Sequence, residues 1–290
     1  MRDTAELESV VIFMLSPFIA NIINLLLIFS KEKLCVWSKK VYNFNMQTVK
    51  MLISYDGSQY SGWQRQRSAP SVQGEIEGAL SNLFAREILI SGASRTDAGV
   101  SAEGQVAVVE IDDFFPVDNL ASALNTRLPN AIFIRSCKRV KSDFSPRYDV
   151  IKKTYVYRIN NGEYNPLLRN SHAHVSYTVD LERINEFLRM IQGEHNFKGY
   201  CSSSAQVKTF ERIIYEAKLT KRGNILTFTF TGNGFLQHMI RILVGTAIDI
   251  GRGKLSIEQA RRALVEGNRA LAGKTMPPEG LVLKKIIFRR

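Results

Sequence analysis

The chain has 290 residues, of which 45% are apolar and 23% are charged, and this composition is typical of a folded protein and excludes a disordered one. Its net charge of +12 favours a polyanionic partner, because cationic side chains that neutralise phosphates release counterions. An anionic membrane would attract the same charge. The three cysteines, Cys35, Cys137 and Cys201, form no CxxC pair and no disulfide framework, which suits a reducing compartment.

Residues 10–29 form an apolar run of membrane-spanning length that Pro17, Asn21 and Asn24 weaken. One interpretation is a membrane anchor, and the lysines that follow it would then leave the rest of the chain in the cytoplasm. The other is a gene start assigned too early, with translation beginning at Met46. We favour the second, so residues 1–45 are predicted to precede the true start, and the protein is predicted to be cytoplasmic. Residues 46–290 hold 34 Lys and Arg against 23 Asp and Glu, and the basic character therefore belongs to them.

Strand and helix patterns alternate from Val49 onward. Val49–Tyr55 alternates apolar and polar side chains, which predicts a strand. Ser71 opens a helix whose apolar residues fall on one face. The elements expected next are strands at 87–93 and 104–111, a helix near 117–127 and a strand at 131–140. This β-α-β-β-α-β order is the signature of a ferredoxin-like unit.

The second half of the chain begins in a similar way. Its expected elements are a strand at 152–160, a helix that Asp180 caps and Gly193 ends, strands at 208–220 and 224–231, a helix at 235–250, a short helix with a capping box of Ser256 and Gln259, and a strand at 281–288. We therefore predict an α+β fold of two ferredoxin-like halves, 46–150 and 151–290, with mostly antiparallel sheets.

The segment Arg95-Thr96-Asp97-Ala98-Gly99 lies between two of the expected strands, and Gly99 permits a tight turn there. A guanidinium two residues from a carboxylate can hold that carboxylate ionised, and such an aspartate suits nucleophilic or general-base work. The same residues also fit a structural turn that carries a surface ion pair. The spacing alone favours the structural turn.

Residues 91–102, SGASRTDAGVSA, resemble the catalytic motif of the TruA family of tRNA pseudouridine synthases. Further segments resemble blocks of that family in the same order and cover essentially all of residues 46–290. These segments are Tyr55-Asp56-Gly57 through Gly62-Trp63-Gln64-Arg65-Gln66, Ser71-Val72-Gln73, Phe144-Ser145-Pro146-Arg147, Lys153-Thr154-Tyr155-Val156-Tyr157, Gly193-Glu194-His195-Asn196-Phe197, Gly234–Arg241 and Pro278-Glu279-Gly280-Leu281. Several ordered blocks specify a family where a single block would not.

The resemblance implies roles for five residues. Asp97 matches the nucleophile or base, and Arg95 matches the arginine that binds the RNA backbone and steers the flipped nucleotide. Tyr155 matches the aromatic residue that packs on the target base. Arg241 matches the partner of the catalytic carboxylate, and Leu281 matches an apolar residue that lines the pocket. Without the resemblance, Tyr155 and Leu281 would be interpreted as core residues. Arg241 could lie on the surface of a helix, but the apolar residues around it favour a buried partner.

The implied reaction isomerises a uridine of tRNA to pseudouridine in a catalytic cleft between the two halves. The bond from N1 to C1′ breaks, the base rotates and C5 joins C1′, which requires no cofactor and no metal. The base must leave its stack first, and a stacking ring with an apolar wall can then hold it. The resemblance also implies a homodimer and a target on the 3′ side of the anticodon stem-loop.

Three positions depart from the residues that are common in the family. Ser94 stands in place of Gly, Ser101 in place of His and Asn196 in place of Asp. The five implied site residues are all retained, so we interpret the departures as divergence within an active lineage. Two alternatives stay open: a catalytically silent tRNA-binding protein on the same fold, and a membrane-associated basic protein in which residues 10–29 are a genuine segment.

Overall fold

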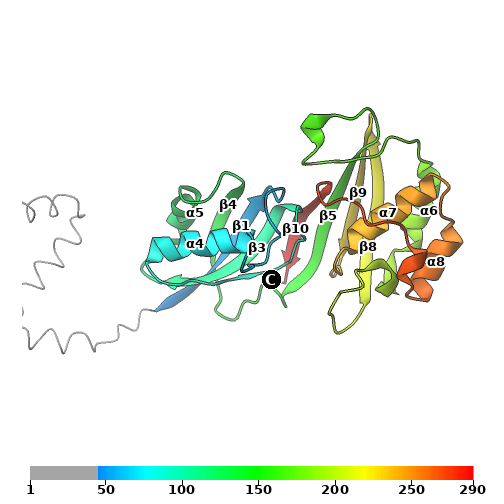
Figure 1. The fold of residues 1–290 in the computed structure, drawn as a ribbon. Helices are drawn as coiled ribbons and strands as arrows, with labels where there is room; N and C mark the ends of the chain where they lie inside the picture. The colour runs from blue at the N-terminus through cyan, green and yellow to red at the C-terminus, as the bar shows by residue number, and fades with distance from the viewer. Residues whose placement is uncertain (1–44, 290) are drawn as a thin grey trace, which may run out of the picture. The chain divides into compact units, whose positions relative to one another are not determined.

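The computed structural model of the protein describes residues 45–289 (Figure 1). These residues contain a ten-stranded sheet. The apolar run at 10–29 lies outside these described residues. Residues 46–290 form one of two compact units of the chain, and the fold below is that unit alone. Within the described range, no helix combines the length and the apolar character needed to cross a bilayer.

The first half contains the predicted β-α-β-β-α-β order. Its elements are β1 (Met46–Tyr55), α4 (Val72–Phe84), β2 (Ile90–Gly92), β3 (Ser101–Asp112), α5 (Val117–Asn125) and β4 (Ile132–Val140). The predicted cap of the first helix is confirmed, since the Ser71 side chain accepts a hydrogen bond from Gly74 N. Alternation along β1 leaves Val49, Met51 and Ile53 without exposed surface, so one face of this strand belongs to the core.

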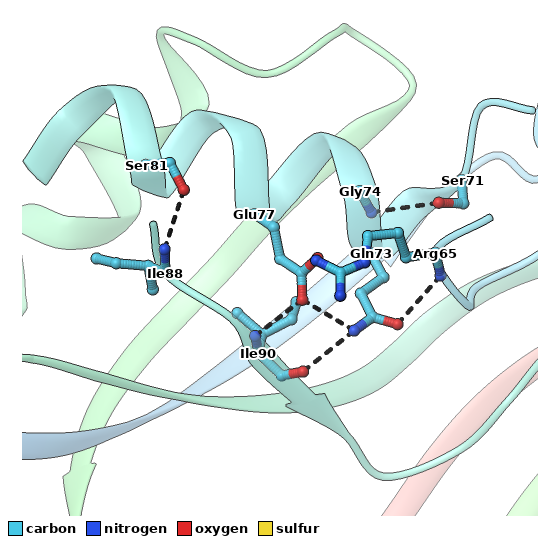
Figure 2. A network of polar contacts seen from close by, with 8 residues as sticks. All are labelled: Arg65, Ser71, Gln73, Gly74, Glu77, Ser81, Ile88 and Ile90. Carbon is cyan, nitrogen blue, oxygen red and sulfur yellow. Dashed lines mark hydrogen bonds and ion pairs between the residues drawn. The ribbon is translucent and has the colours of Figure 1, made fainter. Parts of the chain in front are cut away.

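The second strand is shorter than the seven residues predicted at 87–93. The reason is visible in the polar contacts of its first part, where backbone amides bond to side chains of α4 (Figure 2). Ile88 N donates to Ser81 Oγ at 3.1 Å, and Ile90 N donates to Glu77 Oε1 at 3.0 Å. The Ile88 and Ile90 amides are therefore not available to a neighbouring strand, and the pairing with β3 begins only at Ile90.

The second half is built from six further strands and three helices within the described residues. They are β5 (Val150–Asn160), β6 (Ala173–His174), α6 (Leu181–Met190), β7 (Gly193–Asn196), β8 (Glu211–Arg222), β9 (Ile225–Gly232), α7 (Met239–Gly251), α8 (Ile257–Val265) and β10 (Leu281–Phe288). The Asp180 cap is confirmed by hydrogen bonds from Glu182 N and Arg183 N. Gly193 was predicted only as the end of a helix, and in the structure it also begins a short strand.

Two helix starts differ from the prediction. The helix expected at 235–250 begins at Met239, because His238 before it has a left-handed backbone with φ of 61°. At α8, Ser256 Oγ accepts from Gln259 N as a cap should. The Gln259 amide does not return to Ser256 and instead donates to Leu271 O at 3.4 Å, so the reciprocal half of the predicted capping box is wrong.

Both halves share one strand order. The first half is ordered β4-β1-β3-β2 and the second β10-β5-β9-β8, with β7 beyond β8. All of these neighbours pair antiparallel. Each half is therefore a β-α-β-β-α-β unit with its fourth strand beside its first, which confirms the predicted α+β class of two ferredoxin-like halves.

The last strand joins the two ferredoxin-like halves. β10 lies between β3 and β5, and it pairs parallel to β3 at Val282 with Ser101 and Leu283 with Ala102. β2 pairs with β3 further along, at residues 107–109. The loop 93–100 therefore leaves β2 and re-enters the sheet next to β10, at the junction of the halves. Because one sheet continues through this junction, the domain boundary near residue 150 stays a prediction.

Candidate active site

The loop that carries Asp97 is held in place by hydrogen bonds and a close contact with β1 and with the segment that follows β1. Tyr55 OH lies 2.8 Å from Thr96 Oγ1 in a buried hydrogen bond, and Trp63 N donates to Thr96 O at 3.2 Å. Gly62 lies so close that a Cβ there would stand 2.6 Å from Thr96 O. The residue before Asp97 is thus fixed through its side chain and its carbonyl.

The turn after Asp97 requires the glycine that the sequence places there. Val100 N donates to Asp97 O at 3.1 Å, and Gly99 has φ of 77°, which side chains rarely adopt. A Cβ at Gly99 would also stand 2.8 Å from Pro278 Cγ, in the segment that leads into β10. The predicted tight turn is confirmed, and the second half of the chain packs against it.

The carboxylate of Asp97 faces two cationic or potentially cationic side chains of the second half. Arg241 Nη1 lies 3.5 Å from Asp97 Oδ2, and His238 Nε2 lies 3.6 Å from the same oxygen. The side chain of Arg241 is 14% exposed and that of Asp97 is 25% exposed, so the pair is shielded while one side stays open. These distances are longer than an aligned hydrogen bond, as is common before a substrate closes a site.

His238 is the residue of this site that sequence reasoning missed. It precedes α7 by one residue and stands three positions before Arg241, a spacing that puts two side chains on one face at the start of a helix. That spacing could have identified it. Its left-handed backbone is uncommon for a residue other than glycine, and such conformations concentrate at functional sites.

Tyr155 lies on β5 in register with Leu283 of β10 and Phe230 of β9. Its hydroxyl is 3.0 Å from Ser94 Oγ, and its ring packs edge-to-face on Phe235 at 5.3 Å. Burial raises the pKa of Tyr155 to about 12, the Ser94 hydrogen bond opposes that shift, and the negative charge of Asp97 adds to it. The phenol is therefore protonated at neutral pH and lies within electrostatic reach of Asp97.

The other two predicted site residues differ in environment. Leu281 begins β10 opposite Tyr157 and is buried, with 6% of its surface exposed. Arg95 is exposed, and among residues 45–289 its side chain has no hydrogen bond or ion pair. The two-residue spacing alone indicates Arg95 as the ionic partner of Asp97. In the structure the partners of Asp97 are instead Arg241 and His238.

A polar network around Glu77 of α4 holds the segment from Arg65 to Gln73, which precedes the Asp97 loop in sequence (Figure 2). Glu77 of α4 accepts hydrogen bonds from Gln73 Nε2 at 2.9 Å and Ile90 N at 3.0 Å. Its second oxygen forms an ion pair with Arg65 Nη1 at 3.1 Å. Arg65 N donates to Gln73 Oε1, and Gln73 N donates to Trp63 O. Trp63 itself is buried, so its role is packing beneath the site loop.

A basic groove of about 420 Å³ lies over β1, β3, β4 and β10. Five cationic side chains line it against one acidic side chain, Glu103, which is paired with Lys284 and Arg158. The cations of this groove are Lys50, Arg135, Lys138, Lys284 and Lys285. Such a surface attracts phosphates.

Asp97, Arg241 and His238 thus form a partly open cluster of polar side chains, with the buried ring of Tyr155 within electrostatic reach. The family model described as tRNA pseudouridine synthase matches residues 51–149 and 188–289. The chain belongs to the tRNA pseudouridine synthase family, and it is therefore an isomerase.

Curated relatives agree with this assignment. The chain is 39% identical over 244 residues to tRNA pseudouridine synthase A of Anoxybacillus flavithermus, covering 84% of this chain and 99% of the relative. It is 41% identical over 247 residues to the protein of the same name from Streptococcus agalactiae, covering 84% and 96%. Among solved structures, the crystal structure of a Cbf5-Nop10-Gar1 complex is 10% identical with a TM-score of 0.34, over 81% of this chain and 57% of that one.

Proposed function

We propose that this protein converts uridine to pseudouridine on the 3′ side of the tRNA anticodon stem-loop, with Asp97 as the catalytic carboxylate. The observation that carries the proposal is the position of Asp97 Oδ2, 3.5 Å from Arg241 and 3.6 Å from His238, at a partly open site. The tRNA substrate is supported by the names of the relatives. The position on the anticodon stem-loop is supported by the resemblance in residues 91–102.

The reaction balances without an external reagent. The N1–C1′ bond breaks, the uracil turns, a C5–C1′ bond forms, C5 loses one proton and N1 gains one. Asp97 acts as the nucleophile or the base in this sequence, and its partial exposure lets a nucleotide reach it. Arg241 stabilises its negative charge by direct Coulombic attraction in a shielded setting, and the His238 imidazole lies 3.6 Å from the same oxygen.

The remaining site residues hold the nucleotide. Tyr155 offers a rigid ring whose position is set by β9 and β10, and we assign to it the packing contact with the target base. Leu281 adds apolar surface at the start of β10. Arg95 is exposed and has no polar partner in the described part of the chain, so its guanidinium is available for the RNA backbone.

The basic surface supports the assignment of tRNA as the partner. The charge of the chain is +12, and the groove over β1, β3, β4 and β10 concentrates five cations. Phosphates that bind such a surface release counterions, and the affinity for tRNA should therefore fall as salt rises. We also propose a homodimer, on the basis of the family resemblance alone.

Carbodiimide mapping of pseudouridine in tRNA tests this function. The unmutated protein should modify one or more uridines on the 3′ side of the anticodon stem-loop, and Asp97→Ala should modify none. Asp143→Ala is the matched control, because Asp143 is an exposed aspartate in a turn outside the site. Equal modification by the unmutated protein and Asp97→Ala would contradict the role of Asp97. A protein that binds tRNA and modifies no uridine would be a silent binder instead.

A further inference from the structure

A hydrogen-bonded chain of three side chains runs beneath the proposed site. Lys153 Nζ donates to Ala93 O at 2.9 Å and to Ser94 Oγ at 3.1 Å. Ser94 Oγ lies 3.0 Å from Tyr155 OH in a buried contact. The contacts join β5, which carries Lys153 and Tyr155, to the loop that carries Asp97.

The donor is fixed in one of these hydrogen bonds and open in the other. An ammonium group donates only, so Ser94 Oγ accepts from Lys153. Between Ser94 Oγ and Tyr155 OH either hydroxyl can donate. When Ser94 is the donor, the Tyr155 hydrogen has no protein acceptor among residues 45–289 and can be donated to a bound base.

Ser94 is held in place on its other side as well. Gln105 has no exposed surface, and its Nε2 donates to Ser94 O at 2.7 Å. Ser94 itself is 7% exposed. The backbone of Ser94 is therefore fixed, and its hydroxyl lies in a buried setting beside Tyr155. A glycine, which is the common residue of the family at this position, would have no hydroxyl to place between Lys153 and Tyr155.

We infer that Ser94 is the donor in its contact with Tyr155, and that Lys153 and Ser94 are positioning residues, which orient the Tyr155 hydroxyl so that it donates a hydrogen bond to the target uracil. This inference rests on the proposed function. Cleavage of the N1–C1′ bond places negative charge on the detached uracil, and a donor aimed at a carbonyl oxygen of that ring stabilises the charge as it develops. The high pKa of Tyr155, about 12, keeps this donor protonated.

A double-mutant cycle separates this role from simple packing. Tyr155→Phe keeps the ring and removes the hydroxyl, while Ser94→Ala removes the donor to it. Each single variant should lower kcat for tRNA by roughly three- to tenfold and leave KM unchanged, which corresponds to the loss of one hydrogen bond made in the transition state. The double variant should be no slower than Tyr155→Phe, because Ser94 acts only through the hydroxyl. Ser122→Ala, at an exposed helix position, is the matched control.

Lys153 is tested by two replacements in the same assay. Lys153→Gln retains a donor for Ser94 and should keep more of the unmutated kcat than Lys153→Met. Multiplicative losses in the Ser94→Ala, Tyr155→Phe double variant would overturn the inference, as would a change confined to KM or equal activity of Lys153→Gln and Lys153→Met.

Urea unfolding of the four proteins of the cycle provides a readout that does not depend on activity. Non-additive midpoints would confirm the Ser94–Tyr155 contact itself. If the unmutated protein makes no pseudouridine, the proposed function fails and the inferred role fails with it, whatever the midpoints show. If the unmutated protein is active and Ser94→Ala is equally active, only the inference fails.

Discussion

Arg241 and Met276 are joined by two hydrogen bonds that run in opposite directions. Arg241 Nε donates to Met276 O at 2.6 Å, and Met276 N donates to Arg241 O at 3.1 Å. The side-chain bond uses the Nε atom and leaves Nη1 directed at Asp97. A lysine has no equivalent of this fork, so the geometry depends on arginine and not only on its positive charge.

Arg241→Lys should therefore be a poor substitute. We expect it to keep a cation in the region and to lower kcat/KM for tRNA by roughly 10- to 100-fold, because the charge is no longer held in position. Arg241→Gln should be at least as slow. Steady-state pseudouridine formation measures both variants, with circular dichroism as the control for folding. A lysine variant with unmutated activity would show that only the charge matters.

Two substitutions separate the effect of the His238 imidazole from that of its left-handed backbone. His238→Asn and His238→Ala both lose the imidazole next to Asp97, and we expect a similar fall in kcat for the two. Asn tolerates the left-handed region better than Ala, so the Ala variant should be less stable by about 1 kcal/mol. Chemical denaturation and single-turnover rates measure the two effects. Ala85, which has φ of 51° at the end of α4, offers a control, since Ala85→Gly should raise stability and leave activity unchanged.

Glu77 should contribute to stability and not to chemistry. Glu77→Ala leaves the buried amide of Ile90 without an acceptor and should lower the free energy of unfolding by about 2–4 kcal/mol. Glu77→Gln retains an oxygen for that amide and should cost less than half as much. Urea denaturation checks the order of the two variants. An alanine variant as stable as the glutamine variant would show that the hydrogen bond to Ile90 contributes nothing.

Lys153 should give the protein a pH-dependent stability. Burial lowers the pKa of Lys153 to about 8 from its ordinary value near 10.5, and the positive charges of Arg147 and Arg212 add to the shift. Between these two values the unfolded chain holds the proton and the folded chain does not. The free energy of unfolding therefore rises with pH across this window, and the cost of burying the charge is complete below pH 8.

Lys153→Met removes this titration. The stability of the unmutated protein relative to Lys153→Met should increase between pH 8 and 10.5 by up to about 3 kcal/mol. Denaturation curves at intervals of half a pH unit measure the difference, and tyrosine titration cancels because both proteins share it. Parallel stability curves for the two proteins would mean that Lys153 is not perturbed by burial.

The sequence predicted the helices and strands that are specified by residues close together in the chain. The alternating pattern of β1, the Ser71 and Asp180 caps and the strand at 281–288 all depend on neighbouring residues, and the structure confirms them. The length of β2 depends on side chains of α4 that its own residues do not reveal. The start of α7 depends on a left-handed histidine, a conformation that is uncommon for residues other than glycine.

The site residues that repeat a family pattern could be predicted from the sequence. Those that belong to the site only through their contacts in the fold were harder to predict. The structure brings Asp97, Arg241 and Tyr155 close together, although their roles stay predictions. His238 was missed although its spacing to Arg241 was a usable signal, since Asp97 lies 141 residues before it. The chain from Lys153 through Ser94 to Tyr155 was missed because Ser94 is 59 and 61 residues from its two partners and no pattern in the sequence connects them.

The placement of β10 has a consequence for cleavage of the chain. The strand that joins the two halves follows α8 in sequence, and it pairs with Ser101 and Ala102 near the site loop. Pro278, which packs on Gly99, precedes it directly. A protease that cut between α8 and Pro278 would therefore free a strand from the middle of the sheet and loosen one support of the Asp97 loop, although the cut lies far from that loop in the sequence.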